Sequence, residues 1–148
     1  MQLRVAAASD FAAIAALLSA AGLPALAAAD FRAADFRIAH SGPELIGAIG
    51  VERYGDDGLL RSLVVAPSAR GAGVGARLVD AIEQHARGAA LRSLVLLTTS
   101  AEPFFARRGY TTVARDAVPL AVRESTEFST LCPASAVCMR KSLSGATP

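Results

Sequence analysis

The chain is poor in the residues that mark several classes of protein. It has no tryptophan, two histidines and two cysteines among 148 residues, and its net charge is only +2. The basic residues are scattered and form no stripe, which argues against nucleic acid as a partner. The longest apolar stretch, residues 11–18, is too short to cross a bilayer, and Asp10 interrupts any signal-like start. These absences predict a cytoplasmic protein that binds neither nucleic acid nor membrane.

The two cysteines, Cys132 and Cys138, lie six residues apart, without CxxC spacing and without a neighbouring histidine. This spacing argues against a zinc site, and a cytoplasmic setting argues against a structural disulfide. Cys138 is interpreted as a small apolar residue of a strand. A metalloid-binding protein that uses both thiols is a third functional alternative. It ranks last because soft-metal sites rarely consist of two cysteines without a third ligand.

Hydrophobic residues make up 53% of the chain, which is enough for a folded core. One domain is therefore predicted over residues 1–148, with a frayed polar tail at 142–148. Strands are predicted at residues 3–5, 36–39, 45–54, 59–65, 93–98, 110–113 and 134–141. Helices are predicted from residue 9 to Gly22, in the alanine-rich stretch after Leu23, after Gly75, at 101–108 and at 118–131.

The most informative segment is residues 59–79. Leucines and valines up to Val65 predict a buried strand, which Pro67 ends because proline lacks a ladder donor. Three glycines follow at positions 71, 73 and 75, and an amphipathic helix begins after them. Glycines ahead of a helix N-terminus let backbone N–H groups approach an anion. The segment therefore predicts a cradle for an anion, most naturally a pyrophosphate.

The spacing of the glycines and their neighbours distinguishes the known anion-binding loops that precede a helix. A P-loop needs Lys-Ser or Lys-Thr after its last glycine, where this chain has Ala76-Arg77. A dinucleotide-binding fingerprint needs Gly-x-Gly-x-x-Gly near the start of its unit, whereas here more than sixty residues precede a Gly-x-Gly-x-Gly run. A flexible turn without a ligand is the remaining alternative.

The run Arg70-Gly71-Ala72-Gly73-Val74-Gly75, directly after Val65-Ala66-Pro67, resembles the acetyl-CoA-binding motif of the GNAT superfamily of N-acetyltransferases. The resemblance implies that these six residues hold acetyl-CoA as a co-substrate, with Gly73 and Gly75 N–H groups on the pyrophosphate, and that no metal is needed. The order of predicted elements is also similar to the GNAT fold. It implies an α+β chain with a central mixed, mostly antiparallel sheet, flanked by helices and splayed between its fourth and fifth strands.

A second anchor of the resemblance is residues 101–110, in which Phe104 and Phe105 precede Gly109-Tyr110. In many members of the superfamily the second aromatic residue is a tyrosine that protonates the departing CoA thiolate. Phe105 holds this cofactor-contacting position and cannot donate a proton, whereas Phe104 is expected to pack in the interior. A protein that binds acetyl-CoA as a sensor or scaffold is therefore kept as the second alternative.

The resemblance also implies the groups that act on the acetyl unit. Backbone groups of Leu63, Val64 and Val65 would face the cofactor, and one of their N–H groups would meet the acetyl oxygen. Glu52, at the end of the third long strand, is the candidate general base; the alternatives are a solvated surface carboxylate and water as the base. Candidates to hold a substrate carboxylate, each of which can equally be a surface charge, are Arg37, Arg53, Arg61 and Arg123.

Two further segments, residues 97–105 and 127–139, resemble the GNAT-type acetyltransferases associated with bacterial arsenic-resistance operons. This implies a small amino-acid-like amine as substrate, with an organoarsenical as a specific candidate. Homodimerisation is left open. Substrate residues vary within a superfamily more than cofactor residues do, so this step is less specific than the loop motif.

Overall fold

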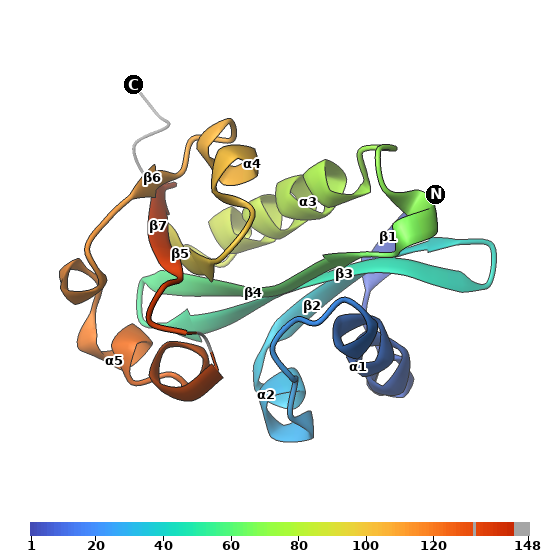
Figure 1. Cartoon of the computed structure of the whole chain (residues 1–148), viewed down its shortest axis with the longest axis horizontal. Helices are drawn as coiled ribbons and strands as arrows, with labels where there is room; N and C mark the ends of the chain where they lie inside the picture. The colour runs from blue at the N-terminus through green and yellow to red at the C-terminus, as the bar shows by residue number, and fades with distance from the viewer. Residues whose placement is uncertain (132, 144–148) are drawn as a thin grey trace. The chain divides into compact units, whose positions relative to one another are not determined.

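The computed structural model describes residues 1–131 and 133–143. In this part of the chain seven strands form one sheet in the order β1-β2-β3-β4-β5-β7-β6 (Figure 1). The strands are β1 (Gln2–Val5), β2 (Asp35–Ser41), β3 (Glu44–Tyr54), β4 (Asp57–Val65), β5 (Ser93–Thr98), β6 (Thr111–Thr112) and β7 (Val137–Ser142). The β4–β5 pair is parallel, whereas β1–β2, β2–β3, β5–β7 and β6–β7 are antiparallel. The predicted fold class, a mixed and mostly antiparallel sheet with flanking helices, is confirmed.

The helices are α1 (Phe11–Ala20), α2 (Ala28–Ala33), α3 (Val74–Gly88), α4 (Glu102–Ala106) and α5 (Leu120–Arg123). Short 3-10 turns lie at Ala8–Asp10, Pro67–Ala69 and Arg115–Ala117, and a π-helical turn lies at Glu127–Leu131. The chain divides into two compact units. Unit 1 comprises Met1–Glu52 and Ser62–His85, and unit 2 comprises Arg53–Arg61 and the chain from Ala86 onward.

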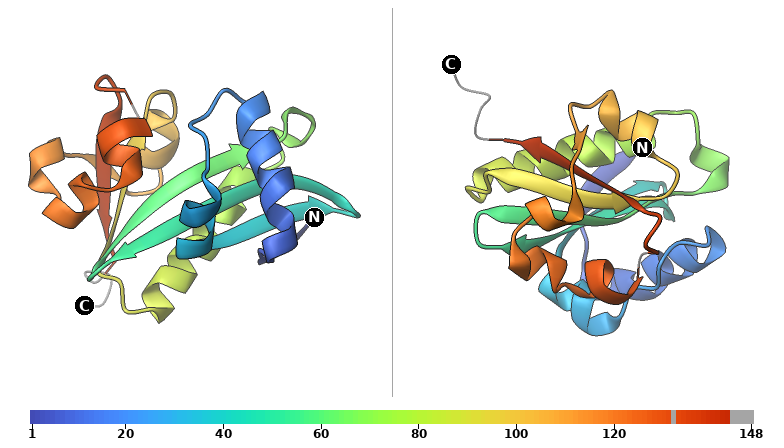
Figure 2. Two further views of the ribbon diagram at one scale, coloured as in Figure 1. Left: turned by 90° about the horizontal axis from the view of Figure 1, so that it is seen from below. Right: turned by 60° about the vertical axis from the view of Figure 1, so that its left-hand side comes forward.

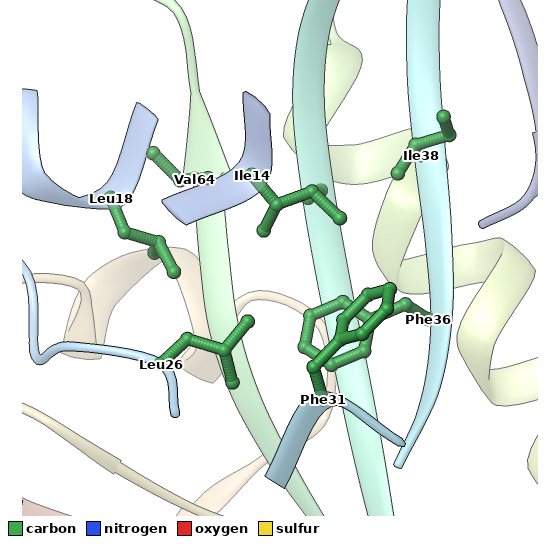
Figure 3. Close-up of a cluster of buried hydrophobic side chains, with 8 residues drawn as sticks. Ile14, Leu18, Leu26, Phe31, Phe36, Ile38 and Val64 are labelled. Carbon is green, nitrogen blue, oxygen red and sulfur yellow. The ribbon is translucent and has the colours of Figure 1, made fainter. Parts of the chain in front are cut away.

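In unit 1, helices cover both faces of the strands: α1 and α2 lie on one face and α3 on the other (Figures 1 and 2). The α1 face holds a cluster of buried apolar side chains (Figure 3). Its largest members are Ile14, Leu18, Leu26, Phe31, Phe36, Ile38 and Val64. Because Ile14 and Leu18 are four residues apart, they lie on one side of α1 and enter this core together. The Phe31 and Phe36 rings pack with centroids 5.2 Å apart.

Gly50 is required by the packing of this core. It is the register partner of Phe36, and a Cβ at position 50 would lie 2.6 Å from the nearest atom of the Phe36 ring. The ring therefore lies directly on the glycine backbone of β3. Because Phe31 also packs against the Phe36 ring, the freedom of this ring to move away is restricted.

The ends of α1 follow from local chemistry. The predicted helix start at Ser9 is instead a 3-10 turn, whose Asp10 carboxylate accepts hydrogen bonds from the Ala7 N–H at 2.7 Å and from Arg4 Nη1 at 2.9 Å. The Arg4 hydrogen bond is the main cause that lowers the pKa of Asp10. Gly22 ends the helix as predicted, at φ +69°, with the Leu23 N–H donating to the Leu18 carbonyl.

Unit 2 has its own apolar core, formed by Leu59, Val95, Val118, Val122, Phe128 and Cys138. Burial raises the pKa of the Cys138 thiol, and the side chain is 3% exposed. The interpretation of Cys138 as a small apolar residue of a strand is therefore confirmed. Cys132 lies outside the described residues.

The predicted helix at 118–131 is wrong in its extent. Helix α5 covers only Leu120–Arg123. Pro119 occupies its N-cap, and the hydrogen bonds of Ser125 interrupt the regular helical pattern after it. The Ser125 hydroxyl accepts from the Phe128 N–H at 3.3 Å, and its carbonyl accepts from the Ser129 hydroxyl at 2.7 Å. Such local side-chain bonds compete with a regular helix. The last strand begins at Val137, later than predicted, since the Ala136 N–H closes a turn onto the Pro133 carbonyl.

Candidate functional site

The loop between β4 and α3 lies in unit 1 and starts from a strand end that is held in place. The Ala66 N–H donates to the Ile46 carbonyl at 2.8 Å, and Pro67–Ala69 then forms one 3-10 turn. Helix α3 begins at Val74, and its first helical bond runs from the Arg77 N–H to the Gly73 carbonyl at 3.1 Å. The N–H groups of the first turn of α3 therefore have no acceptor within the helix, and they give this end a partial positive charge.

Two glycines give the loop its shape. Gly71 has φ +84° and Gly73 has φ +78°, both in the left-handed region that favours glycine. A Cβ at either position would meet no heavy atom within 4 Å, so backbone conformation and not crowding requires glycine in this loop. Gly75, by contrast, lies inside α3. The residues from Arg70 to Gly73 are exposed, while Val74 is buried and anchors the helix start.

The strand that leads into this loop has an unusual backbone. Ser62, within β4, has φ +60°, and among the described residues only Ser62 and Ala90 are non-glycine residues in the left-handed region. The β4–β5 register contains three pairs, from Asp57↔Ser93 to Leu59↔Val95. The later part of β4, including Leu63, Val64 and Val65, is outside this register. Val64 is buried in the unit 1 core, whereas Leu63 and Val65 are half-buried.

Glu52 is a buried residue of β3, with 7% of its surface exposed. The alternative that it is a solvated surface carboxylate is therefore wrong. Side chains alternate along a strand, so Glu52 lies on the same face of β3 as Gly50 and the Phe36 ring. A carboxylate that is buried on the same face as an aromatic ring needs polar partners to offset the loss of water, unlike a solvated surface carboxylate.

The candidate arginines lie in different environments. Arg61 is 3% exposed and lies within β4 of unit 2, so it is not a surface charge. Arg37 is half-buried and donates to the Phe36 carbonyl at 3.3 Å. Arg123 is exposed, and its Nε donates to the Val118 carbonyl at 3.1 Å; Arg53 is exposed. The charge of Arg61 inside an otherwise apolar run was the sequence signal that could have marked it as buried.

The α4 segment of unit 2 folds as predicted around its glycine. Gly109 has φ +92°, and the Tyr110 N–H donates to the Phe105 carbonyl at 3.1 Å. Phe105 is 5% exposed and meets the rings of Phe104 and Tyr110 edge-on, at centroid distances of 5.1 and 5.3 Å. Phe104 is only half-buried, and Arg108 lies over its ring at 5.0 Å. Phe105 is therefore the more buried of the two phenylalanines, whereas Phe104 was expected to be the packing residue.

Neither a metal centre nor a membrane segment emerges from the described residues. Within residues 1–131 and 133–143, no three His, Cys, Asp or Glu side chains gather where they could hold an ion. The helices in those ranges are all too short or too polar to cross a bilayer.

The profile of the acetyltransferase (GNAT) domain matches residues 32–112, which is more than half of the chain. The chain therefore belongs to the GNAT acetyltransferase domain family, and the predicted resemblance is confirmed at that level. An amino-acid acetyltransferase of Ralstonia nicotianae is 32% identical over 88 residues, which cover 58% of this chain and 20% of that protein. The chain thus matches about a fifth of the length of this relative.

Solved structures agree with the family. A Mycobacterium tuberculosis protein in complex with CoA and NLQ has a TM-score of 0.81 at 25% identity, over 96% of this chain and 99% of that chain. The N-acetylglutamate synthase of Neisseria gonorrhoeae, in complex with CoA and N-acetyl-glutamate, also has a TM-score of 0.81 at 25% identity. That match covers 97% of this chain and 35% of the synthase chain.

Proposed function

We propose that this chain transfers an acetyl group from acetyl-CoA to the amino group of a small amino-acid-like molecule. The observation that carries the proposal is the cradle between β4 and α3, in which Arg70-x-x-Gly73-x-Gly75 leads into a helix whose first N–H groups have no acceptor within the helix. Two left-handed glycines keep this loop open and exposed. Relatives named as amino-acid acetyltransferases and solved structures that contain CoA support the same function.

The chain's residues would divide the work as follows. The loop from Arg70 to Gly75 would bind the pyrophosphate through backbone N–H groups and the N-terminus of α3. An N–H of Leu63, Val64 or Val65 would donate to the acetyl oxygen, where negative charge develops. Glu52 would accept the proton of the attacking amine, directly or through water.

The residues assigned so far do not include a proton donor for the departing CoA sulfur. A bond forms between the amine nitrogen and the acetyl carbon, the bond from that carbon to the CoA sulfur breaks, the amine loses a proton and the sulfur gains one. Phe105 cannot supply the second proton, so we assign it to water or to another group. Phe105 instead packs edge-on against Phe104 and Tyr110, within the segment that the resemblance places at the cofactor.

The acceptor that we propose has an α-amino group and a carboxylate, and a glutamate-like organoarsenical belongs to the same class. The resemblance of residues 97–105 and 127–139 to acetyltransferases of arsenic-resistance operons supports the organoarsenical. The cytoplasmic location also stays a prediction from composition. A thiol-based metalloid site is less well supported, because burial of Cys138 raises its pKa and disfavours the thiolate that binds soft metals.

The test combines binding and turnover. Calorimetric titration with acetyl-CoA is expected to show one site, and release of free CoA thiol is then measured with amino acids and with a glutamate-like organoarsenical. Turnover on an amino acid or on the arsenical supports the proposal. Tight binding of acetyl-CoA without turnover on any amine would support the sensor alternative instead. An absence of acetyl-CoA binding would overturn the proposal.

A further inference from the structure

A groove of about 390 Å³ lies in unit 1, apart from the glycine loop. Its walls come from β1, from Arg37 of β2 and from the second half of α3, where Gln84 and His85 line it. Because an α-helix rises about 1.5 Å per residue, Gln84 lies about 15 Å along α3 from Val74, the first residue of that helix. The groove is therefore a different place from the N-terminus of α3.

Strand pairing determines which side chains enter the groove. Val5 and Arg37 are register partners of β1 and β2, so both point to the same face of the sheet. Ile38, the next residue of β2, belongs to the core on the α1 face, so Arg37 points to the opposite face, which α3 covers (Figures 1 and 2). Asp35 shares this face, and its Oδ2 lies 2.9 Å from Nε2 of His85. This contact joins β2 to α3 beside the groove.

Arg37 is the groove residue with hydrogen-bond donors to spare. Its half-buried side chain donates from Nη1 to the Phe36 carbonyl at 3.3 Å, and in the part of the chain that the structure describes this is its only hydrogen bond. A guanidinium has five N–H donors, arranged in a fork that matches a carboxylate. Arg4 also lines the groove, but its Nη1 and Nη2 bond both carboxylate oxygens of Asp10, at 2.9 and 3.0 Å.

The other groove residues narrow the class of anion. The exposed Gln84 amide can donate to a second ligand oxygen, next to Arg37. Leu3 and Val5 give the groove an apolar part, and Val5 is 61% exposed, so a short hydrocarbon chain can cover it. The Asp35 carboxylate on the same face disfavours a second negative charge on the ligand. A carboxylate with a short alkyl group therefore fits better than a phosphate dianion.

We propose that this groove is a second ligand site, which binds a small monocarboxylic acid. Arg37 and Gln84 bind the carboxylate, and Leu3 and Val5 contact the alkyl group. The sequence makes Arg37 one of the candidates for the carboxylate of the acetyl acceptor, whereas the groove assigns it to a separate ligand. The inference does not depend on the proposed function, because no groove residue belongs to the loop from Arg70 to Gly75.

The test follows backbone amide NMR signals of the full chain during titration with sodium butyrate. Butyrate should shift the signals of Val5, Arg37 and Gln84 in a saturable way, with a Kd of about 1 mM, because one charge-assisted contact at a solvent-open site is weak. n-Butanol lacks the charge and inorganic phosphate lacks the alkyl group, and each should bind at least about tenfold more weakly at the same ionic strength.

Two substitutions with matched controls locate the site. Arg37→Gln should weaken butyrate binding at least about tenfold, whereas the same change at the exposed Arg32 of α2 should stay within about twofold of wild type. Gln84→Glu changes only an exposed residue and should also weaken binding, by charge repulsion. Its control is Gln2→Glu, on the other face of β1.

Three results would overturn the proposal. Equal butyrate affinities of the wild type and of Arg37→Gln or Gln84→Glu would show that the groove does not bind the carboxylate. Butyrate shifts confined to the loop from Arg70 to Gly75 would place the anion at the start of α3 instead. Phosphate that binds as tightly as butyrate would contradict a site for monocarboxylates. Acetyl-CoA titration of the same samples tests the proposed function separately.

Discussion

Three glycines of unit 1 form a matched set with which the anion cradle can be tested. Gly22, Gly71 and Gly73 have φ of +69°, +84° and +78°, and at none of them would a Cβ meet a heavy atom within 4 Å. Alanine at each position therefore adds the strain of a left-handed backbone without a steric clash. That strain is about 1–2 kcal/mol per residue. Only Gly73 is the motif glycine at the N-cap of α3.

The three variants should thus lose similar stability but differ in affinity. For a chain of this length, about 1 kcal/mol of destabilisation lowers Tm by about 2–4 °C, so each variant should melt about 2–8 °C below wild type. A phosphate group in contact with the Gly73 N–H would meet the new methyl group directly. We expect Gly73→Ala to weaken acetyl-CoA binding at least about tenfold, which corresponds to about 1.4 kcal/mol. Gly73→Val should weaken it by orders of magnitude.

Gly22→Ala is the control for backbone strain alone, since Gly22 ends α1 and takes no part in the loop. Gly71→Ala tests strain elsewhere in the same loop: Gly71 also belongs to the proposed acetyl-CoA loop, but it is not one of the specified positions of Arg-x-x-Gly-x-Gly, so its affinity should fall less than that of Gly73→Ala. Affinities are measured by calorimetry well below the lowest Tm of the set. Equal affinities of the Gly73→Ala and Gly22→Ala proteins would refute the placement of the pyrophosphate at Gly73.

Four other predictions test parts of the structure outside this loop. Glu52→Gln should lower kcat by about 10²–10⁴-fold at unchanged acetyl-CoA affinity and remove one limb of the pH–rate profile, as loss of a general base does; wild-type kcat/KM would assign Glu52 another role. Phe105→Tyr puts a hydroxyl into a site that is 5% exposed, so Tm should fall and kcat should not rise. A large gain in kcat would instead show that thiolate protonation limits the natural enzyme. Gly50→Ala should cost about 1–3 kcal/mol in chemical denaturation, because its methyl group would overlap the Phe36 ring; an unchanged midpoint contradicts this packing. Asp10 has a pKa lowered chiefly by Arg4, so its contribution to stability is present above the unfolded value of about 3.9 and lost as pH falls below it. The Tm difference between wild type and Asp10→Asn should accordingly shrink in acid, and a constant difference would argue against the ion pair.

The cradle could be predicted because every requirement in it is local. Six consecutive residues, from Arg70 to Gly75, contain the glycines that take left-handed backbone and the start of α3. The same holds for Gly22 and Gly109, whose positive φ values end a helix within a few residues of the glycine. Backbone conformation at a turn depends on the residue and its neighbours, so a single sequence is enough to specify it.

Burial could not be predicted in the same way. Arg61 lies in an apolar run, and Glu52 ends one, but a run of letters does not say whether a charge at its edge points to solvent or to the interior. The structure buries both, at 3% and 7% exposure. The order of burial of Phe104 and Phe105 likewise depends on Tyr110, which meets Phe105 edge-on after the chain has turned at Gly109. Periodicity predicts faces of elements, and it does not predict which neighbour covers them.

Separation along the chain explains why the glycine loop could be predicted from the sequence, whereas the hydrogen-bonded cluster of Asp57, Ser93 and Arg140 could not. Asp57 is 36 residues from Ser93 and 83 residues from Arg140, so only the finished sheet brings the three together. The candidates to hold an acceptor carboxylate are likewise scattered along the chain, for example Arg37 in β2 and Arg61 in β4. Under the proposed function, recognition of the cofactor would depend on one short motif, whereas recognition of the amine would depend on residues that tertiary packing brings together. It follows that the acceptor is best identified by turnover on a panel of amines, while the cofactor can be tested by substitutions at single loop positions.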